Sequence, residues 1–95
     1  MIIVIGHVIT TPQVHDAMLE LSLEHVARSR AERGCIAHNV HIDCEYASRL
    51  VFVEYWADVA TFAVPASREF VGKMRELSPE PIQMKVFDAA EQTPA

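Results

Sequence analysis

The chain has 95 residues, of which 51% are apolar, and its formal net charge is −5 at pH 7. A chain of this length suits one domain, and its apolar content is sufficient for a hydrophobic core. The acidic balance argues against nucleic acid as a partner, because binding to phosphates depends on basic side chains. We therefore expect a single domain over residues 1–95, with a frayed tail from about residue 89.

The cysteine content and the N-terminal segment indicate the environment of the protein. Cys35 and Cys44 show neither the spacing of metal ligands nor a disulfide framework. The apolar opening MIIVIGHVIT lacks the basic start of a signal peptide and is too short to span a bilayer. These features predict a cytoplasmic protein with reduced thiols and no membrane partner. The role of Cys44 is left open.

The first half of the chain predicts a strand followed by a long helix. Residues 2–9 are rich in β-branched side chains, which favours a strand. Thr11 and Pro12 are residue types of a helix start, with Thr11 as the cap, and the helix is expected to continue to Arg33. Gly34 is then expected to end it in a left-handed conformation.

The second half predicts three further strands and a broken helix. Asp58 is a suitable cap for a short helix, and Pro65 is expected to end that helix. The predicted elements are, in order, strand 35–43, strand 49–56, a short helix over 59–64, a helix from about Ser67 and strand 82–88.

The order β-α-β-β-α-β, with the second helix broken at Pro65, is that of a ferredoxin-like α+β sandwich. Both faces of the first strand are apolar, since Ile3 and Ile5 alternate with Val4 and Val8. The helices can cover only one face of the sheet, so another surface must cover the second. We expect that a second copy does so and that the protein is a homodimer packed sheet against sheet.

Three segments, RAERGCIAHNVHID, FVEYW and ADVATF, resemble the antibiotic biosynthesis monooxygenase family of dimeric ferredoxin-like proteins, also described as dimeric α/β barrels. Glu32, Gly34, Cys35, Glu54 and Trp56 match the family pattern, and the resemblance extends over nearly the whole chain. It implies the fold more specifically than the reaction. The family includes cofactor-free oxygenases that make quinones, quinol oxidases, haem-degrading enzymes and a signal-molecule isomerase.

This chain departs from the polar residues of each subgroup. The quinone-forming oxygenases carry an Asn four residues before the Trp and a Tyr six residues after it, where this chain has Phe52 and Phe62. An Arg on their last helix is matched by Arg75. The haem-degrading relatives use an Asn on the first strand, and His7 stands at that position here.

The third predicted strand indicates a pocket. Phe52, Glu54 and Trp56 alternate along it and therefore share one face. We expect Phe52 and Trp56, with Phe62 and Phe70, to line a crevice for a flat ring between sheet and helices. The alternative is that these aromatic residues are core residues. Glu54 is expected to form an ion pair or a helix-end contact at the dimer seam that orders the end of the strand, with catalysis as the alternative, and its role is left open.

His7 and His38 are the candidates for a catalytic base, because a buried imidazole stays neutral and can accept a proton from a phenol. Each could instead be a hydrogen-bonded core residue. Arg75 is the candidate for holding the resulting oxyanion. No metal site is expected, since His38 and His41 face opposite ways on a strand.

We therefore expect a cofactor-independent monooxygenase or quinol-oxidising enzyme that acts with O₂ on a small aromatic or polyketide-like substrate. Two alternatives stay open. The first is a haem-binding or haem-degrading relative, and the second is a non-catalytic dimer that binds a small molecule.

Overall fold

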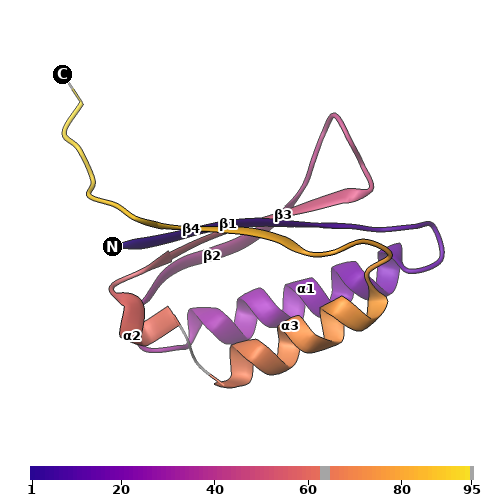
Figure 1. The fold of residues 1–95 in the computed structure, drawn as a ribbon, viewed down its shortest axis with the longest axis horizontal. Helices are drawn as coiled ribbons and strands as arrows, with labels where there is room; N and C mark the ends of the chain where they lie inside the picture. The colour runs from indigo at the N-terminus through magenta and orange to yellow at the C-terminus, as the bar shows by residue number, and fades with distance from the viewer. Residues whose placement is uncertain (63–64, 95) are drawn as a thin grey trace.

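A computed structural model describes residues 1–62 and 65–94. Four strands form one antiparallel sheet in the order β2-β3-β1-β4, and helices α1 and α3 lie against one of its faces (Figure 1). This arrangement confirms the predicted ferredoxin-like α+β fold. The elements are β1 (Ile2–Ile9), α1 (His15–Arg30), β2 (Cys35–Ile42), β3 (Arg49–Trp56), α2 (Val59–Phe62), α3 (Pro65–Leu77) and β4 (Gln83–Asp88).

Helix α1 is shorter at both ends than the sequence predicts. The Thr11 carbonyl accepts hydrogen bonds from the N–H groups of Val14 and His15, and no side chain caps the helix, so Thr11 starts a turn instead. At the other end the N–H groups of Ala31 and Glu32 bond three residues back, which tightens the last turn and ends the helix at Arg30.

Gly34 has the predicted left-handed conformation, with φ +84°. A Cβ atom at this position would overlap the side chain of Thr61 in α2. The glycine therefore both turns the chain into β2 and lets α2 approach that turn.

The broken helix agrees with the sequence in part. The Asp58 carboxylate accepts the N–H of Thr61 at 3.0 Å, which confirms the cap of α2. The predicted end of this helix falls at residues 63–64, which lie outside the described residues. Helix α3 begins at Pro65 and not near Ser67, because proline needs no N–H partner in the first turn of a helix.

The two faces of the sheet have different surroundings. Val4 pairs with Glu54 and Val8 with Leu50 on the face toward the helices, where they are buried. Two core clusters occupy this side; their buried members are Val8, Met18, Val26, Leu50, Phe52 and Met74 in one, and Ile2, Val4 and Trp56 in the other.

The other face, which we call the open face, carries the alternating residues of β1, β3 and β4. Ile3 pairs with Tyr55 and Phe87, and Ile5 pairs with Val53. Ile5 is 45% exposed and Phe87 is 46% exposed, so this apolar face is uncovered in the single chain. Its burial by a second copy stays a prediction. No helix in residues 1–62 and 65–94 has the length and apolar content needed to cross a membrane.

Candidate functional site

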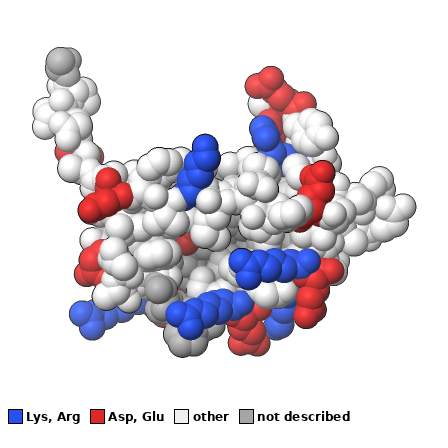
Figure 2. Space-filling view, in the orientation of Figure 1, with Lys and Arg blue, Asp and Glu red and all other residues white. Residues whose placement is uncertain are grey.

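A cavity with a volume of about 380 Å³ lies between the sheet and α3, and we call it the helix-side cavity. Figure 2 shows the hollow on this face of the molecule, with basic side chains beside it. A volume of this size is typical of small-molecule sites. Apolar side chains supply most of the wall: Val4, Val8, Phe52, Phe62, Val71, Met74, Ile82 and Met84. The polar residues are His7, His25, Glu54, Ser67, Arg68, Arg75 and Gln83.

The cavity lies between the sheet and α3, which packs chiefly against α1 and joins the core on the sheet through Met74. Phe70 of α3 stacks on His25 of α1, with ring centroids 5.5 Å apart, and the Arg28 guanidinium lies 5.2 Å from the centroid of the same ring. These contacts fix α3 at its α1 side. On the sheet side, Met84 and Val86 of β4 stay about half exposed.

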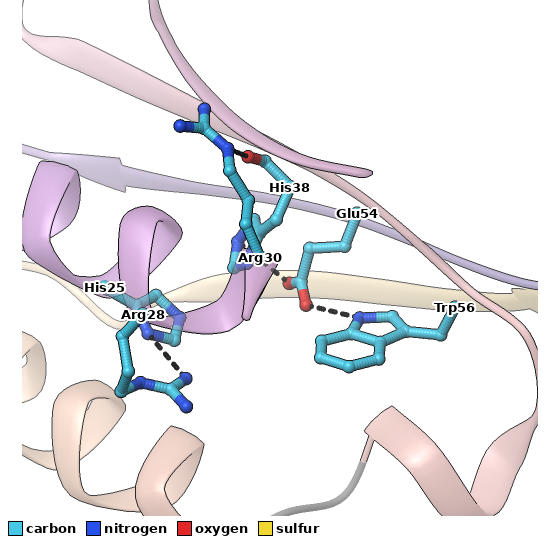
Figure 3. A network of polar contacts seen from close by, with 6 residues as sticks. All are labelled: His25, Arg28, Arg30, His38, Glu54 and Trp56. Carbon is cyan, nitrogen blue, oxygen red and sulfur yellow. Dashed lines mark hydrogen bonds and ion pairs between the residues drawn. The ribbon is translucent and has the colours of Figure 1, made fainter. Parts of the chain in front are cut away.

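A buried polar group lies beside the cavity, and Figure 3 shows its side chains. The Trp56 indole N–H donates a hydrogen bond of 2.9 Å to Oε1 of Glu54. The other oxygen, Oε2, lies 3.6 Å from Nε2 of His38. Trp56 and His38 are fully buried, whereas Glu54 is 9% exposed and borders the cavity.

The protonation of this group follows from its burial. Burial raises the pKa of Glu54, although the Trp56 hydrogen bond acts in the opposite direction. Burial, together with the positive charges of neighbouring residues, lowers the pKa of His38 to about 3. His38 is therefore a neutral imidazole at pH 7, and its contact with Glu54 is not an imidazolium–carboxylate ion pair. Neither ring nitrogen of His38 has a hydrogen-bond partner among the described residues.

His25 connects the cavity to this group. Its ring lies edge-on to that of His38, with centroids 4.9 Å apart. Burial, followed by the charge of Arg28, lowers the pKa of His25 to about 4. A second neutral imidazole thus borders the cavity beside Glu54.

The four aromatic residues expected in the pocket divide into two pairs. Phe52 and Phe62 border the cavity. Trp56 does not border the cavity and is fully buried against Ile2 and Val4. Its indole N–H donates a hydrogen bond to Glu54, which does border the cavity. Phe70 packs on His25 and Arg28 and forms the α1–α3 contact.

The three predicted catalytic residues also lie in different places. Arg75 borders the cavity, and His38 is buried behind Glu54. His7 pairs with Val51 and Gln83. This register directs its imidazole to the open face, although the residue as a whole also borders the cavity. The structure therefore does not bring the two histidines together.

His25 and Arg68 were missed as cavity residues from the sequence. His25 lies seven residues after the buried Met18 on α1, so its inward position could be predicted, but its contact with the cavity depends on how α3 packs. Arg68 and Arg75 are also seven residues apart, so the predicted helix already placed them on one helix face, but their contact with the cavity depends on how that helix packs.

Groups of three His, Cys, Asp or Glu side chains arranged as metal ligands are absent from the part of the chain that the structure describes. The polar residues around the cavity thus offer one buried carboxyl, a neutral imidazole and two guanidinium groups. This set can accept a proton and hold an anion.

Solved structures show that the fold is shared. A Deinococcus radiodurans protein, whose assignment as an antibiotic biosynthesis monooxygenase is itself provisional, is similar with TM-score 0.90 and 17% identity, over 100% of this chain and 98% of the other. A Mycobacterium tuberculosis protein is similar with TM-score 0.85 and 18% identity, over 98% of each chain. An antibiotic biosynthesis monooxygenase of known structure reaches TM-score 0.83 and 25% identity, over 96% of this chain and 100% of the other.

Residues 1–64 match the sequence model of the antibiotic biosynthesis monooxygenase family. The chain belongs to this family. An uncharacterised protein of Synechocystis is 30% identical over 94 residues, which is 95% of this chain. The chain spans 64% of the length of that relative.

Proposed function

We propose that the protein is an oxidoreductase that uses O₂ to oxidise a small aromatic compound bearing a hydroxyl group, without a cofactor. The observation that carries this proposal is the helix-side cavity, where apolar walls surround a buried carboxyl and a neutral imidazole. An apolar cavity with few polar groups suits a flat ring and excludes water from it.

The proposed reaction begins with loss of the substrate's hydroxyl proton. The resulting phenolate is electron-rich and passes electrons to O₂. A quinol loses two electrons and two protons in this way, giving a quinone while O₂ becomes hydrogen peroxide. In a monooxygenation, a CH₂ group of the substrate becomes a carbonyl, with one oxygen atom retained in the product and the other released as water.

Glu54 is the group that we assign as the proton acceptor. It borders the cavity, and Oε1 is held by the Trp56 N–H, which leaves Oε2 for the substrate. Burial raises the pKa of Glu54, which brings its basicity closer to that needed at neutral pH. His38, 3.6 Å behind Oε2, is then a positioning residue. His7, the first candidate from the sequence, has its imidazole on the open face by register.

Oxygen uptake tests the assignment. The purified protein is incubated with a panel of dihydroxynaphthalene-type phenols, and uptake is compared with a reaction lacking protein. We expect protein-dependent uptake that falls at least about 100-fold in Glu54→Gln, because a general base contributes roughly 10²–10⁴-fold. Gln keeps the acceptor for the Trp56 N–H, so the fold is retained.

His7→Ala is the matched variant and is expected to keep the activity. Loss of activity in His7→Ala with full activity in Glu54→Gln would return the base to His7. No protein-dependent uptake across the panel, combined with binding of the same phenols, would favour the non-catalytic alternative. A shifted Soret band on titration with haem would favour the haem-binding alternative.

A further inference from the structure

Two arginines of α3 face the helix-side cavity. Arg68 and Arg75 both border it and are separated by seven residues, or about two helical turns, so they lie on one helix face roughly 10 Å apart along the axis. Val71 and Met74, between them, also border the cavity. This face of α3 therefore presents an apolar strip with an arginine at each end, and both side chains are long enough to converge on one group above the strip.

Neither arginine has an ion-pair or hydrogen-bond partner among the described residues. The ion pairs found there are Arg28–Glu32, Arg49–Asp43 and Lys73–Glu69. The sequence explains this, because the positions three and four residues from each arginine hold no Asp or Glu. By contrast, Lys73 on the same helix has Glu69 four residues before it and pairs with it.

The cavity is positive in a protein that is negative overall. Asp and Glu outnumber Lys and Arg by 13 to 8 in the chain, yet Glu54 is the one carboxyl that borders the cavity in the described residues. Even with that carboxylate ionised, the two arginines outnumber it among the lining residues. Basic side chains lie beside the hollow in Figure 2. The two guanidinium charges are thus available to a ligand.

We propose that Arg68 and Arg75 bind a fixed anionic group, a carboxylate, on the aromatic substrate of the helix-side cavity. The proposal rests on the proposed function for the reaction, but it concerns recognition and can be tested by binding alone. The planar guanidinium suits a carboxylate because it offers parallel N–H donors. The apolar strip between the arginines would contact the ring that bears this group.

Calorimetric titration with a matched pair of ligands tests the proposal. The pair is 1-hydroxy-2-naphthoate and 1-naphthol, which share the ring and the hydroxyl and differ in the carboxylate. We expect the carboxylate to bind about tenfold more tightly, since two partly exposed ion pairs contribute roughly that factor together. Added salt should reduce the ratio of the two affinities.

Variants show which residues cause the tighter binding of the carboxylate ligand. Arg68→Gln and Arg75→Gln are each expected to lower the affinity for the carboxylate about threefold, and the double variant to remove the preference. The affinity for 1-naphthol should not change. Lys73→Gln removes a charge from the same helix at a position that does not border the cavity, and it is expected to leave the ratio unchanged.

The outcomes separate this proposal from the proposed function. Equal affinities for the two ligands, or a preference that survives the double variant, would overturn the anion site. A preference without oxygen uptake on any phenol would support the anion site while overturning the oxidation. Failure of both ligands to bind would overturn both proposals.

Discussion

At the scale of residues, Trp56 and Glu54 form a buried hydrogen bond that determines the position of the carboxyl in the site. Trp56 is fully buried, and its indole N–H needs an acceptor. Glu54 precedes it by two residues on the same strand face and provides that acceptor. The carboxyl thereby becomes buried next to His38 and the cavity. A residue that completes the core is thus also the one that we propose as the proton acceptor.

The two buried histidines make the stability of the fold depend on pH. Their pKa values are lowered from 6.5 to about 4 in His25 and about 3 in His38, so the unfolded chain binds more protons than the folded one below pH 6.5. The free energy of unfolding should then fall as the pH falls from 6.5 toward 4, with a limiting slope of about 1.4 kcal/mol per pH unit for each histidine.

Urea unfolding at a series of pH values measures this slope. We expect His25→Gln and His38→Gln each to have a shallower slope between pH 6.5 and 4 than the wild type, whatever their absolute stability. His41→Gln, at an exposed position of β2, is the control and should keep the wild-type slope. Slopes that do not change in either buried variant would show that these histidines do not carry the acid sensitivity.

At the scale of elements, two glycines differ in whether their position tolerates a side chain. Gly34 holds a left-handed φ between α1 and β2, and a Cβ there would overlap Thr61. Gly72 lies inside α3 with nothing within 4 Å of the position of an added Cβ. The first glycine is needed by the fold, and the second only weakens its helix.

Alanine at each position should therefore have effects of opposite sign. Gly34→Ala is expected to lower the free energy of unfolding by about 1–3 kcal/mol, because of the strained conformation and the overlap. Gly72→Ala is expected to raise it by roughly 0.5–1 kcal/mol. Thermal unfolding of both variants measures this. A neutral Gly34→Ala would contradict the tight approach of α2 to the turn.

The elements also show what could be predicted from the sequence. The bounds of β1 and β3 follow from their β-branched runs, and the Asp58 cap and the Gly34 turn follow from residue chemistry. The start of α1 could not be predicted, because Thr11 and Pro12 are equally suited to a cap and to the turn that they form.

The strand residues of the site could be predicted from the sequence, whereas the helix residues could not. Strand alternation correctly placed Phe52, Glu54 and Trp56 on one face of β3, and the structure shows that this face is the helix side. It equally placed His7 with Ile3 and Ile5, which is the open face, but the sequence does not show which face meets the cavity. His25 and Arg68 reach the cavity through the packing of α3 on α1, which depends on contacts distant in sequence.

At the scale of the whole molecule, the open face is an apolar surface that no other part of the described chain covers. Three of its apolar side chains, Ile5, Tyr55 and Phe87, are 37–46% exposed in the single chain. The β2–β3 hairpin and the segment after β4 project on the side of this face (Figure 1). A second copy would bury the apolar residues and lie between the projecting segments.

Sedimentation equilibrium tests the predicted homodimer. The wild type is expected to have twice the mass of one chain, and Ile5→Glu to have the mass of one chain, because it places a charge at the centre of the apolar face. Leu23→Glu makes the same kind of change at an exposed position of α1 and should stay dimeric. A wild type of single-chain mass at all concentrations would rule the dimer out.

The central claim is that oxidation takes place in the helix-side cavity. The most direct test is oxygen uptake with dihydroxynaphthalenes in a variant whose larger side chain fills the cavity. Val71 borders the cavity, and Val71→Phe would occupy the space of the substrate ring. We expect this variant to lose at least about tenfold in kcat/KM, since displacement of a substrate is costly. Leu23→Phe, at an exposed site on α1, should match the wild type. Wild-type turnover in Val71→Phe would contradict the assignment of the reaction to this cavity.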